Sequence, residues 1–182
     1  MKNHFIAIVI FLLLNNGLLA QNASSKMIVF LKAGKIKLNK KDVIKEWKLN
    51  SFTAILDTFS RKKEGLNRVY TYDNLGIVLF EPSPQKKPTG LVSEFQIILD
   101  ETETSSITPK SFYEGKLTID KMDFTRNAVI EEIRKKLTDY KEIETDENDK
   151  YRFSKDGIYL YFIYNKNKNL SKVIFGKDKL IQ

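Results

Sequence analysis

The chain has 182 residues, a formal net charge of +8 and no cysteine. Without cysteine, it has no disulfide, no thiol catalysis and no cysteine-bound zinc. Its single histidine, His4, lies in the apolar leader described next, so the mature chain lacks a Ser-His-Asp triad and a histidine general base. Only carboxylate, lysine and tyrosine chemistry remains. We therefore expect a protein that is not an enzyme and that has no cofactor and no metal site.

Residues 1–20 are typical of a secretory signal peptide. Lys2 gives a positive start, Phe5 to Leu14 is an unbroken apolar run, and Ala20 is the small residue that a signal peptidase requires. The apolar run is too short to span a bilayer as a helix. We expect an exported protein, periplasmic or extracellular, that is not stably inserted in the membrane once this segment is removed.

Residues 21–99 are predicted to form a first α+β unit. Short strands are expected at 27–31 and 35–38, followed by a helix that Ser51 caps. Alternation of apolar and polar residues then predicts an antiparallel meander with strands at 68–72, 77–81 and 91–99. The segment 82–90 carries three prolines, which cannot join a sheet ladder, and is expected to be an exposed loop.

Residues 100–112, rich in Glu, Thr and Ser, are predicted to be a linker, and 113–182 a second α+β unit. In that unit Thr125 is predicted to cap a helix that runs to Asp139. The strands expected around it are 116–119, 150–154, 158–164 and 171–175.

The two units repeat one pattern at an offset of 81 residues. The segment GKIKLNK at 34–40 returns as GKLTIDK at 115–121, and YTYDNLGIVL at 70–79 returns as YRFSKDGIYL at 151–160. Internal repeats decide architecture before local propensity does. The sequence therefore predicts an α+β fold built by tandem duplication, in which each unit is a strand, a helix and a three-stranded antiparallel meander, with the helices on one sheet face.

A helix on one face of each meander would leave the opposite face open, and alternation identifies the residues on it. In the second unit these are Arg152, Tyr159, Tyr161, Lys172 and Ile174, and in the first unit Thr71, Val78, Phe80, Glu94 and Gln96. Tyrosine and arginine provide large contact areas with polar tips, which is typical of protein-recognition surfaces. We predict a binding site for another protein made of Tyr159, Tyr161, Arg152, Lys172, Phe80 and Glu94.

Several alternatives stay open. The two sheets could continue edge to edge or pack on each other, which would bury these side chains, or they could enclose a small-ligand cleft. A carboxylate pair drawn from Glu81, Glu94 and Asp100 would suit a hydrolase of envelope polysaccharide. An envelope structural or scaffolding role is a further alternative. Nucleic acid is not expected as a partner, because the aromatic pattern of sheet-surface stacking modules is absent.

The Tyr-x-Tyr-Asp-x-Leu-Gly-Ile-x-Leu segment at 70–79 precedes a Phe-x-Ile strand at 95–97. This combination resembles uncharacterised exported bacterial domain families, in which a tyrosine-rich hairpin precedes a valine or isoleucine strand. The duplicated plan is also similar, in architecture only, to the beta-lactamase inhibitory protein, a secreted tandem repeat that binds an enzyme with its concave sheet. That similarity implies an inhibitor or immunity-type role, without a shared target, since the inhibitor's disulfides have no counterpart here.

Overall fold

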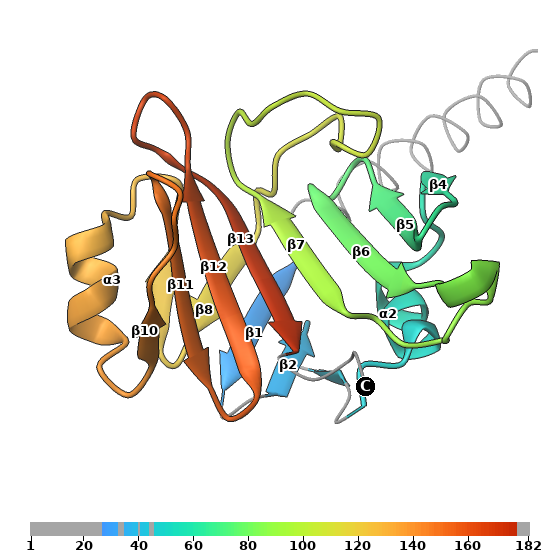
Figure 1. Ribbon diagram of the computed structural model, residues 1–182, viewed down its shortest axis with the longest axis horizontal. Coiled ribbons are helices and arrows are strands. Elements are labelled where there is room, and N and C mark those ends of the chain that lie inside the picture. Colours follow the sequence, from blue (N-terminus) through green and yellow to red (C-terminus); the bar gives the residue numbers. More distant parts are fainter. Residues whose placement is uncertain (1–26, 33–34, 40, 44–45, 178–182) are drawn as a thin grey trace, which may run out of the picture.

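The computed structural model describes residues 27–32, 35–39, 41–43 and 46–177. The predicted signal peptide, residues 1–20, lies outside the described residues. The protein is α+β, with two sheets and two α-helices in the described part (Figure 1). Neither of these helices combines the length and hydrophobicity needed to cross a membrane.

The larger sheet has eight strands, all antiparallel, in the order β10-β11-β12-β13-β7-β6-β5-β4. Its strands are β4 (Arg61–Lys63), β5 (Asn67–Tyr72), β6 (Ile77–Pro82), β7 (Glu94–Ile98), β10 (Lys141–Ile143), β11 (Lys150–Lys155), β12 (Ile158–Tyr164) and β13 (Leu170–Lys177). The two meanders therefore continue edge to edge through β7 and β13. Each has four strands rather than the predicted three, because β4 and β10 are short edge strands whose charged residues carry no apolar alternation.

The smaller sheet is mixed and has the order β3-β2-β1-β8-β9. Its strands are β1 (Ile28–Lys32), β2 (Lys35–Leu38), β3 (Lys41–Val43), β8 (Lys116–Ile119) and β9 (Met122–Phe124). β1 pairs antiparallel with β2 and parallel with β8. The first strands of both predicted units thus leave their meanders and pair with each other.

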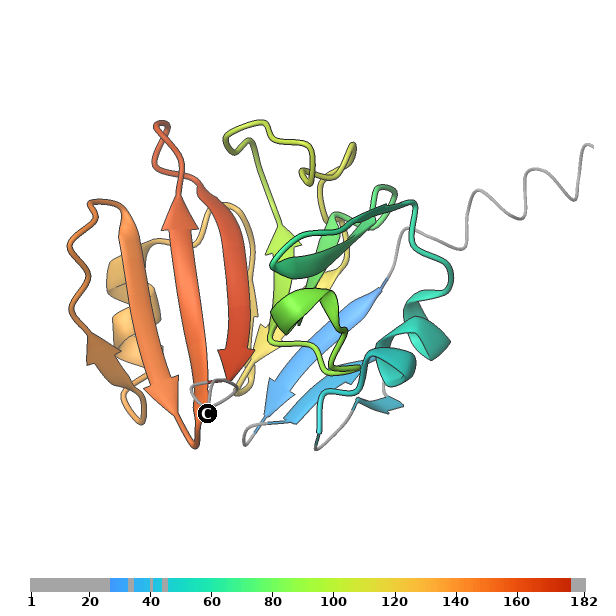
Figure 2. The same ribbon diagram turned by 45° about the vertical axis from the view of Figure 1, so that its right-hand side comes forward.

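The helices are α2 (Leu49–Leu56) and α3 (Ile130–Lys136), and a short 3-10 turn, η1, covers Pro84–Lys86. Both helices and the smaller sheet lie on the same side of the larger sheet (Figures 1 and 2). Their apolar side chains join those of the larger sheet in one core cluster. At its centre the ring of Phe95 lies 5.8 Å from that of Phe52 and 5.6 Å from that of Phe175. The core therefore bridges the two halves of the chain.

The predicted helix starts are wrong at both helices. Lys48 is the N-cap of α2, and Ser51 lies within the helix. Thr125 does not begin α3, because the chain before it is extended: Phe124 pairs with Leu117 in β8. The Phe124 ring also stacks at 5.4 Å on that of Phe162. Sheet pairing and aromatic burial outweigh the local capping preference here.

Several elements correspond at the offset of 81 residues. It carries the bounds of β2 onto β8 and of β3 onto β9, including the pairing register of the two hairpins. It also carries Leu49, the first residue of α2, onto Ile130, the first of α3. The strand order of the larger sheet is symmetric about the β7 and β13 pair. The correspondence is looser in the β5–β6 and β11–β12 hairpins, whose turns have four and two residues.

Tyr113, just after the predicted linker, connects the two sheets. Its hydroxyl donates to the carbonyls of Met27, at 2.5 Å, and Lys116, at 3.0 Å. Its backbone N–H donates to the carbonyl of Ile98 in β7, at 2.7 Å. The neighbouring backbone leaves no room at Gly76, where a Cβ would lie 2.3 Å from the Tyr113 nitrogen.

We predict that Gly76→Ala destabilises the protein more than Gly157→Ala, its counterpart at the offset of 81. Both glycines have a left-handed φ, of 65° and 75°, which disfavours alanine by about 1 kcal/mol. A Cβ at Gly157 meets nothing within 4 Å, whereas one at Gly76 meets backbone. The clash should add about 1–3 kcal/mol to the loss in free energy of unfolding, measured by urea denaturation. Equal losses would show that the Tyr113 backbone can move away.

Candidate binding groove on the open sheet face

The face of the larger sheet that points away from the helices carries two rows of cross-strand neighbours. Directly paired residues share a face, so each row can be followed through all eight strands. The first row is Ile143, Arg152, Tyr161, Ile174, Gln96, Val78, Thr71 and Arg61. The second row is Lys141, Ser154, Tyr159, Gly176, Glu94, Phe80, Val69 and Lys63. The predicted assignment of Tyr159, Tyr161, Arg152, Phe80 and Glu94 to one face agrees with this register.

The predicted linker covers the first-half part of this face. In Figure 1 it is the yellow-green loop that arches from the end of β7 towards β5. The hydroxyl of Thr71 donates to the carbonyl of Ile107 in this loop, at 3.2 Å. Thr71 and Val78 were expected on an open surface but are only 2% and 1% exposed. The open part of the face is thus confined to β7 and the second-half strands.

Arg61 holds this loop in place. Its guanidinium donates to the carbonyls of Ser106 and Thr108, both at 2.7 Å. It also donates through two nitrogens, at 2.9 and 2.6 Å, to the carboxylate of Asp73 in the β5–β6 turn. The hydrogen bond from Arg61 is the main cause that lowers the pKa of Asp73 below its ordinary value.

The open part of the face forms a groove of ≈ 550 Å³, which we call the tyrosine groove. Its lining comes from four strands and from the loop between β10 and β11: Glu94, Arg152, Tyr159, Tyr161, Ile174, Glu144, Thr145, Asp146 and Glu147. Four of the six predicted binding residues therefore lie together, and the acidic loop that forms the groove's wall was not predicted as part of the site.

Tyr159 is fixed across the floor of the groove. Its hydroxyl donates at 2.8 Å to the carboxylate of Glu94, which also accepts from the Gln96 amide at 3.1 Å. The guanidinium of Arg152 lies 4.6 Å from the centre of the Tyr159 ring. A Cβ at Gly176 would lie 2.0 Å from the ring. The missing side chain at Gly176 thus lets Tyr159 lie over β13 and reach β7.

Gly176 is the positioning residue that sequence reasoning missed. A glycine inside a strand often marks a close approach of another group, so the signal was present in the sequence. It could be interpreted only once the register placed Gly176 between Tyr159 and Glu94.

Phe80 and Lys172 do not line the groove. Phe80 is half-buried and follows Glu94 in the second row. Lys172 is half-buried between Ile163 and Ile98 in a neighbouring row. Burial lowers the pKa of Lys172, and the nearby charge of Glu94 opposes this shift.

The carboxylates considered for hydrolysis do not meet. Glu81 is 1% exposed and accepts hydrogen bonds of 2.6 Å from the Tyr70 hydroxyl and the Gly90 N–H. It follows Phe80, which pairs with Glu94, so Glu81 and Glu94 lie on opposite faces of the sheet. Asp100 accepts from the Asn169 amide at 2.7 Å. Among the described residues, no three acidic or histidine side chains are grouped to hold a metal ion.

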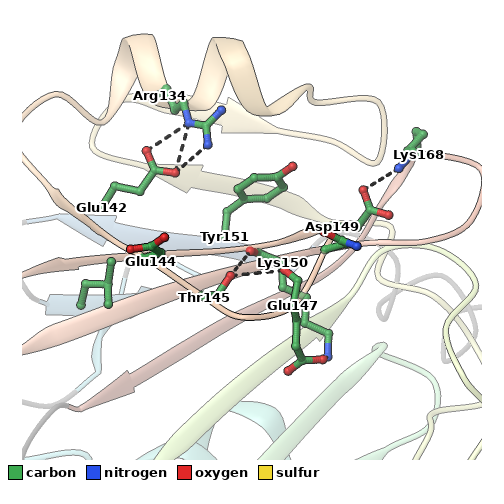
Figure 3. A pocket seen from close by; sticks show the side chains of 11 residues that line it. Arg134, Glu142, Glu144, Thr145, Glu147, Asp149, Lys150, Tyr151 and Lys168 are labelled. Carbon is green, nitrogen blue, oxygen red and sulfur yellow. Dashed lines mark hydrogen bonds and ion pairs between the residues drawn. The ribbon is translucent and has the colours of Figure 1, made fainter.

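A second hollow, of ≈ 510 Å³, lies on the other side of the β10–β11 loop (Figure 3). Its charged groups largely pair with one another. Arg134 donates to Glu142 at 2.8 Å and lies 5.1 Å from the centre of the Tyr151 ring. Lys168 and Asp149 pair at 2.6 Å. The tyrosine groove has an apolar and aromatic floor in addition to charge, and is the better candidate binding site.

We predict that Gly176→Ala disrupts the groove, because the new methyl group would displace the Tyr159 ring. The free energy of unfolding should fall by about 1–3 kcal/mol in the natural chain. In a Tyr159→Ala background the same change should have an effect of no more than about 0.5 kcal/mol, since the clash is gone. A double-mutant cycle by urea denaturation measures the difference. Additive effects would mean that Tyr159 does not depend on Gly176.

We also predict a pH-dependent role for Asp73. Asp73→Asn should lower the free energy of unfolding by about 1–2 kcal/mol at pH 7, because it removes the charge-assisted bonds to Arg61. The folded-state pKa of Asp73 is depressed, so its contribution is complete above the ordinary pKa of about 4 and is lost as the pH falls through the folded value.

Urea denaturation at pH 7, 5 and 3 should therefore show a difference between the natural chain and Asp73→Asn that shrinks only at the lowest pH. The matched control is Asp146→Asn, at an exposed loop position. A difference that stays constant down to pH 3 would contradict the charge-based account.

Residues 28–134, from the start of β1 into α3, match the family described as Domain of unknown function (DUF7738). No curated protein and no solved structure matches the chain, so the similarity to the beta-lactamase inhibitory protein stays one of element order. Of the groove residues, Glu94 lies within the matched segment, whereas Arg152, Tyr159 and Tyr161 follow it. The match covers more than half of the 182 residues, and the chain therefore belongs to the DUF7738 family.

Proposed function

We propose that this protein is an exported, non-enzymatic module that binds a basic segment of a partner protein in the tyrosine groove. The observation that carries this proposal is the fixed floor, in which Tyr159, held by Glu94 and Arg152, lies beside Tyr161. A preorganised aromatic surface loses little conformational entropy when a partner binds. Inhibitors and immunity-type proteins are special cases of such a module.

The charge of the groove supports a basic partner. Its lining holds four carboxylates, from Glu94, Glu144, Asp146 and Glu147, against the single cation of Arg152. One of these, Glu147, is paired with Lys150. The groove is therefore acidic on a chain whose formal net charge is +8. Complementary charge guides association and selects against acidic partners.

The placement of the carboxylates favours binding over hydrolysis. Glycoside cleavage needs two acids on either side of one bond. Glu81 and Glu94 lie on opposite faces of the sheet, and Glu81 is tied to the backbone of Gly90. Export remains a proposal supported by the composition of residues 1–20.

We further propose that the scaffold is a tandem duplication. The 81-residue sequence offset, the equal bounds of β2 and β8 and of β3 and β9, and the symmetric strand order all support it. In this proposal the two copies diverged on the open face, where Thr71, Val78 and Phe80 correspond to Arg152, Tyr159 and Tyr161. The small first-copy residues Thr71 and Val78 lie beneath the linker, whereas the second-copy residues line the groove.

We predict that Tyr161→Ala weakens partner binding by about 2 kcal/mol, or roughly 30-fold, because central tyrosines dominate many interfaces. The mature protein, tagged, would be incubated with its own cell envelope, and the captured protein would be purified and titrated by calorimetry. The melting temperature should change by only a few degrees, since Tyr161 is half-buried.

The matched control is Tyr164→Phe, a tyrosine of the same strand outside the groove, whose hydroxyl donates to the Ala128 carbonyl. Neutralising Glu144 and Asp146 together should also weaken binding and reduce its salt dependence. Unchanged affinity in both groove variants would refute the proposed site.

A further inference from the structure

We propose that a lysine-lined hollow, separate from the tyrosine groove, binds a doubly charged oxyanion such as a phosphate or sulfate group. The hollow has a volume of ≈ 270 Å³. Four different parts of the chain supply its lining: Lys32, Asp120, Lys121, Lys136, Asp139, Tyr140 and Lys155. Four lysines face two aspartates, so the lining carries a net charge of +2, which matches a dianion.

The carboxylates of the hollow already have partners. The hydroxyl of Tyr140 donates to Asp120 at 2.6 Å. The ammonium of Lys155 lies 3.9 Å from Asp120 and 3.5 Å from Asp139, and 5.1 Å from the centre of the Tyr140 ring. Tyr140, Asp120 and Lys155 thus form a connected group in which Lys155 balances much of the negative charge.

The remaining three lysines have no carboxylate partner. Lys32, at the end of β1, Lys121, in the β8–β9 turn, and Lys136, at the end of α3, take part in none of the ion pairs within the described residues. Elsewhere in the described chain, lysines such as Lys116 pair with nearby acids. Ammonium groups on flexible stems bind phosphate as point charges. Three uncompensated ammoniums around one hollow therefore favour an anionic ligand.

The charge is specific to the second half of the chain. At the offset of 81 residues, Lys136 corresponds to Ile55 and Lys155 to Asn74. The floor residue Tyr140, with its hydroxyl, corresponds to Phe59. The polar floor and two of the lysines therefore have no counterpart in the first half, so the repeated scaffold alone does not account for them.

The site can be tested by isothermal titration of the mature protein with inorganic phosphate and sulfate, using chloride as the reference anion. The combined variant Lys32→Gln, Lys121→Gln, Lys136→Gln should bind on the order of tenfold more weakly, from the loss of three exposed charge contacts. Asp139→Asn should bind a few-fold more tightly, because it removes the acid that competes for Lys155.

The control variant Lys86→Gln, Lys87→Gln, Lys166→Gln has the same change in charge at exposed positions outside the hollow. It should leave affinity unchanged, as should Tyr161→Ala in the groove. Equal losses in both lysine variants, or no preference for phosphate or sulfate over chloride, would overturn the proposal. Melting curves establish that each variant is folded before it is titrated.

A second titration series distinguishes the sources of the anion. Glycerol phosphate represents a small phosphomonoester, dextran sulfate a sulfated polymer, and vesicles with phosphatidylglycerol an anionic membrane. A sensitivity to the three hollow lysines that appears with at least one of these ligands supports the site and identifies its ligand class. Binding that none of the hollow variants alters would refute it for all three.

Discussion

The pairing of β7 with β13 is the interaction on which the rest of the structure depends. It joins two four-stranded meanders into one sheet, and it sets Phe95 opposite Phe175 at the centre of the core. The same register sets Gly176 opposite Glu94 on the other face. A slip of one residue would turn the core side chains outward, which would expose large aromatic surface, so the register is strongly determined.

The tyrosine groove is a direct consequence of that junction. Tyr159 belongs to one half of the chain and Glu94 to the other, and they meet only because Gly176 lies between them without a side chain. The linker makes the face asymmetric, since Arg61 and Asp73 hold it over one half alone. One half of the sheet is therefore closed and the other is left to bind a partner.

The sequence predicted the face of these residues better than their contacts. Period-two alternation is local, so it assigned Tyr159, Tyr161 and Arg152 to one side correctly. It could not show which part of that side would be covered, because the linker's position depends on hydrogen bonds from Arg61 to residues 45 and 47 positions away. The helix expected from Thr125 failed for a related reason: Phe124 is extended by a strand partner and a ring contact distant in sequence.

By itself the sequence determined the order of the main strands, the 81-residue correspondence and the alternation that separates core from surface, because each depends on near neighbours in the chain. Only the tertiary structure decided that β1 joins β8, that β7 joins β13, and that Tyr159 reaches Glu94 across Gly176. These contacts are set by packing between distant segments, where the burial of rings such as Phe95 and Phe124 contributes more than local propensity.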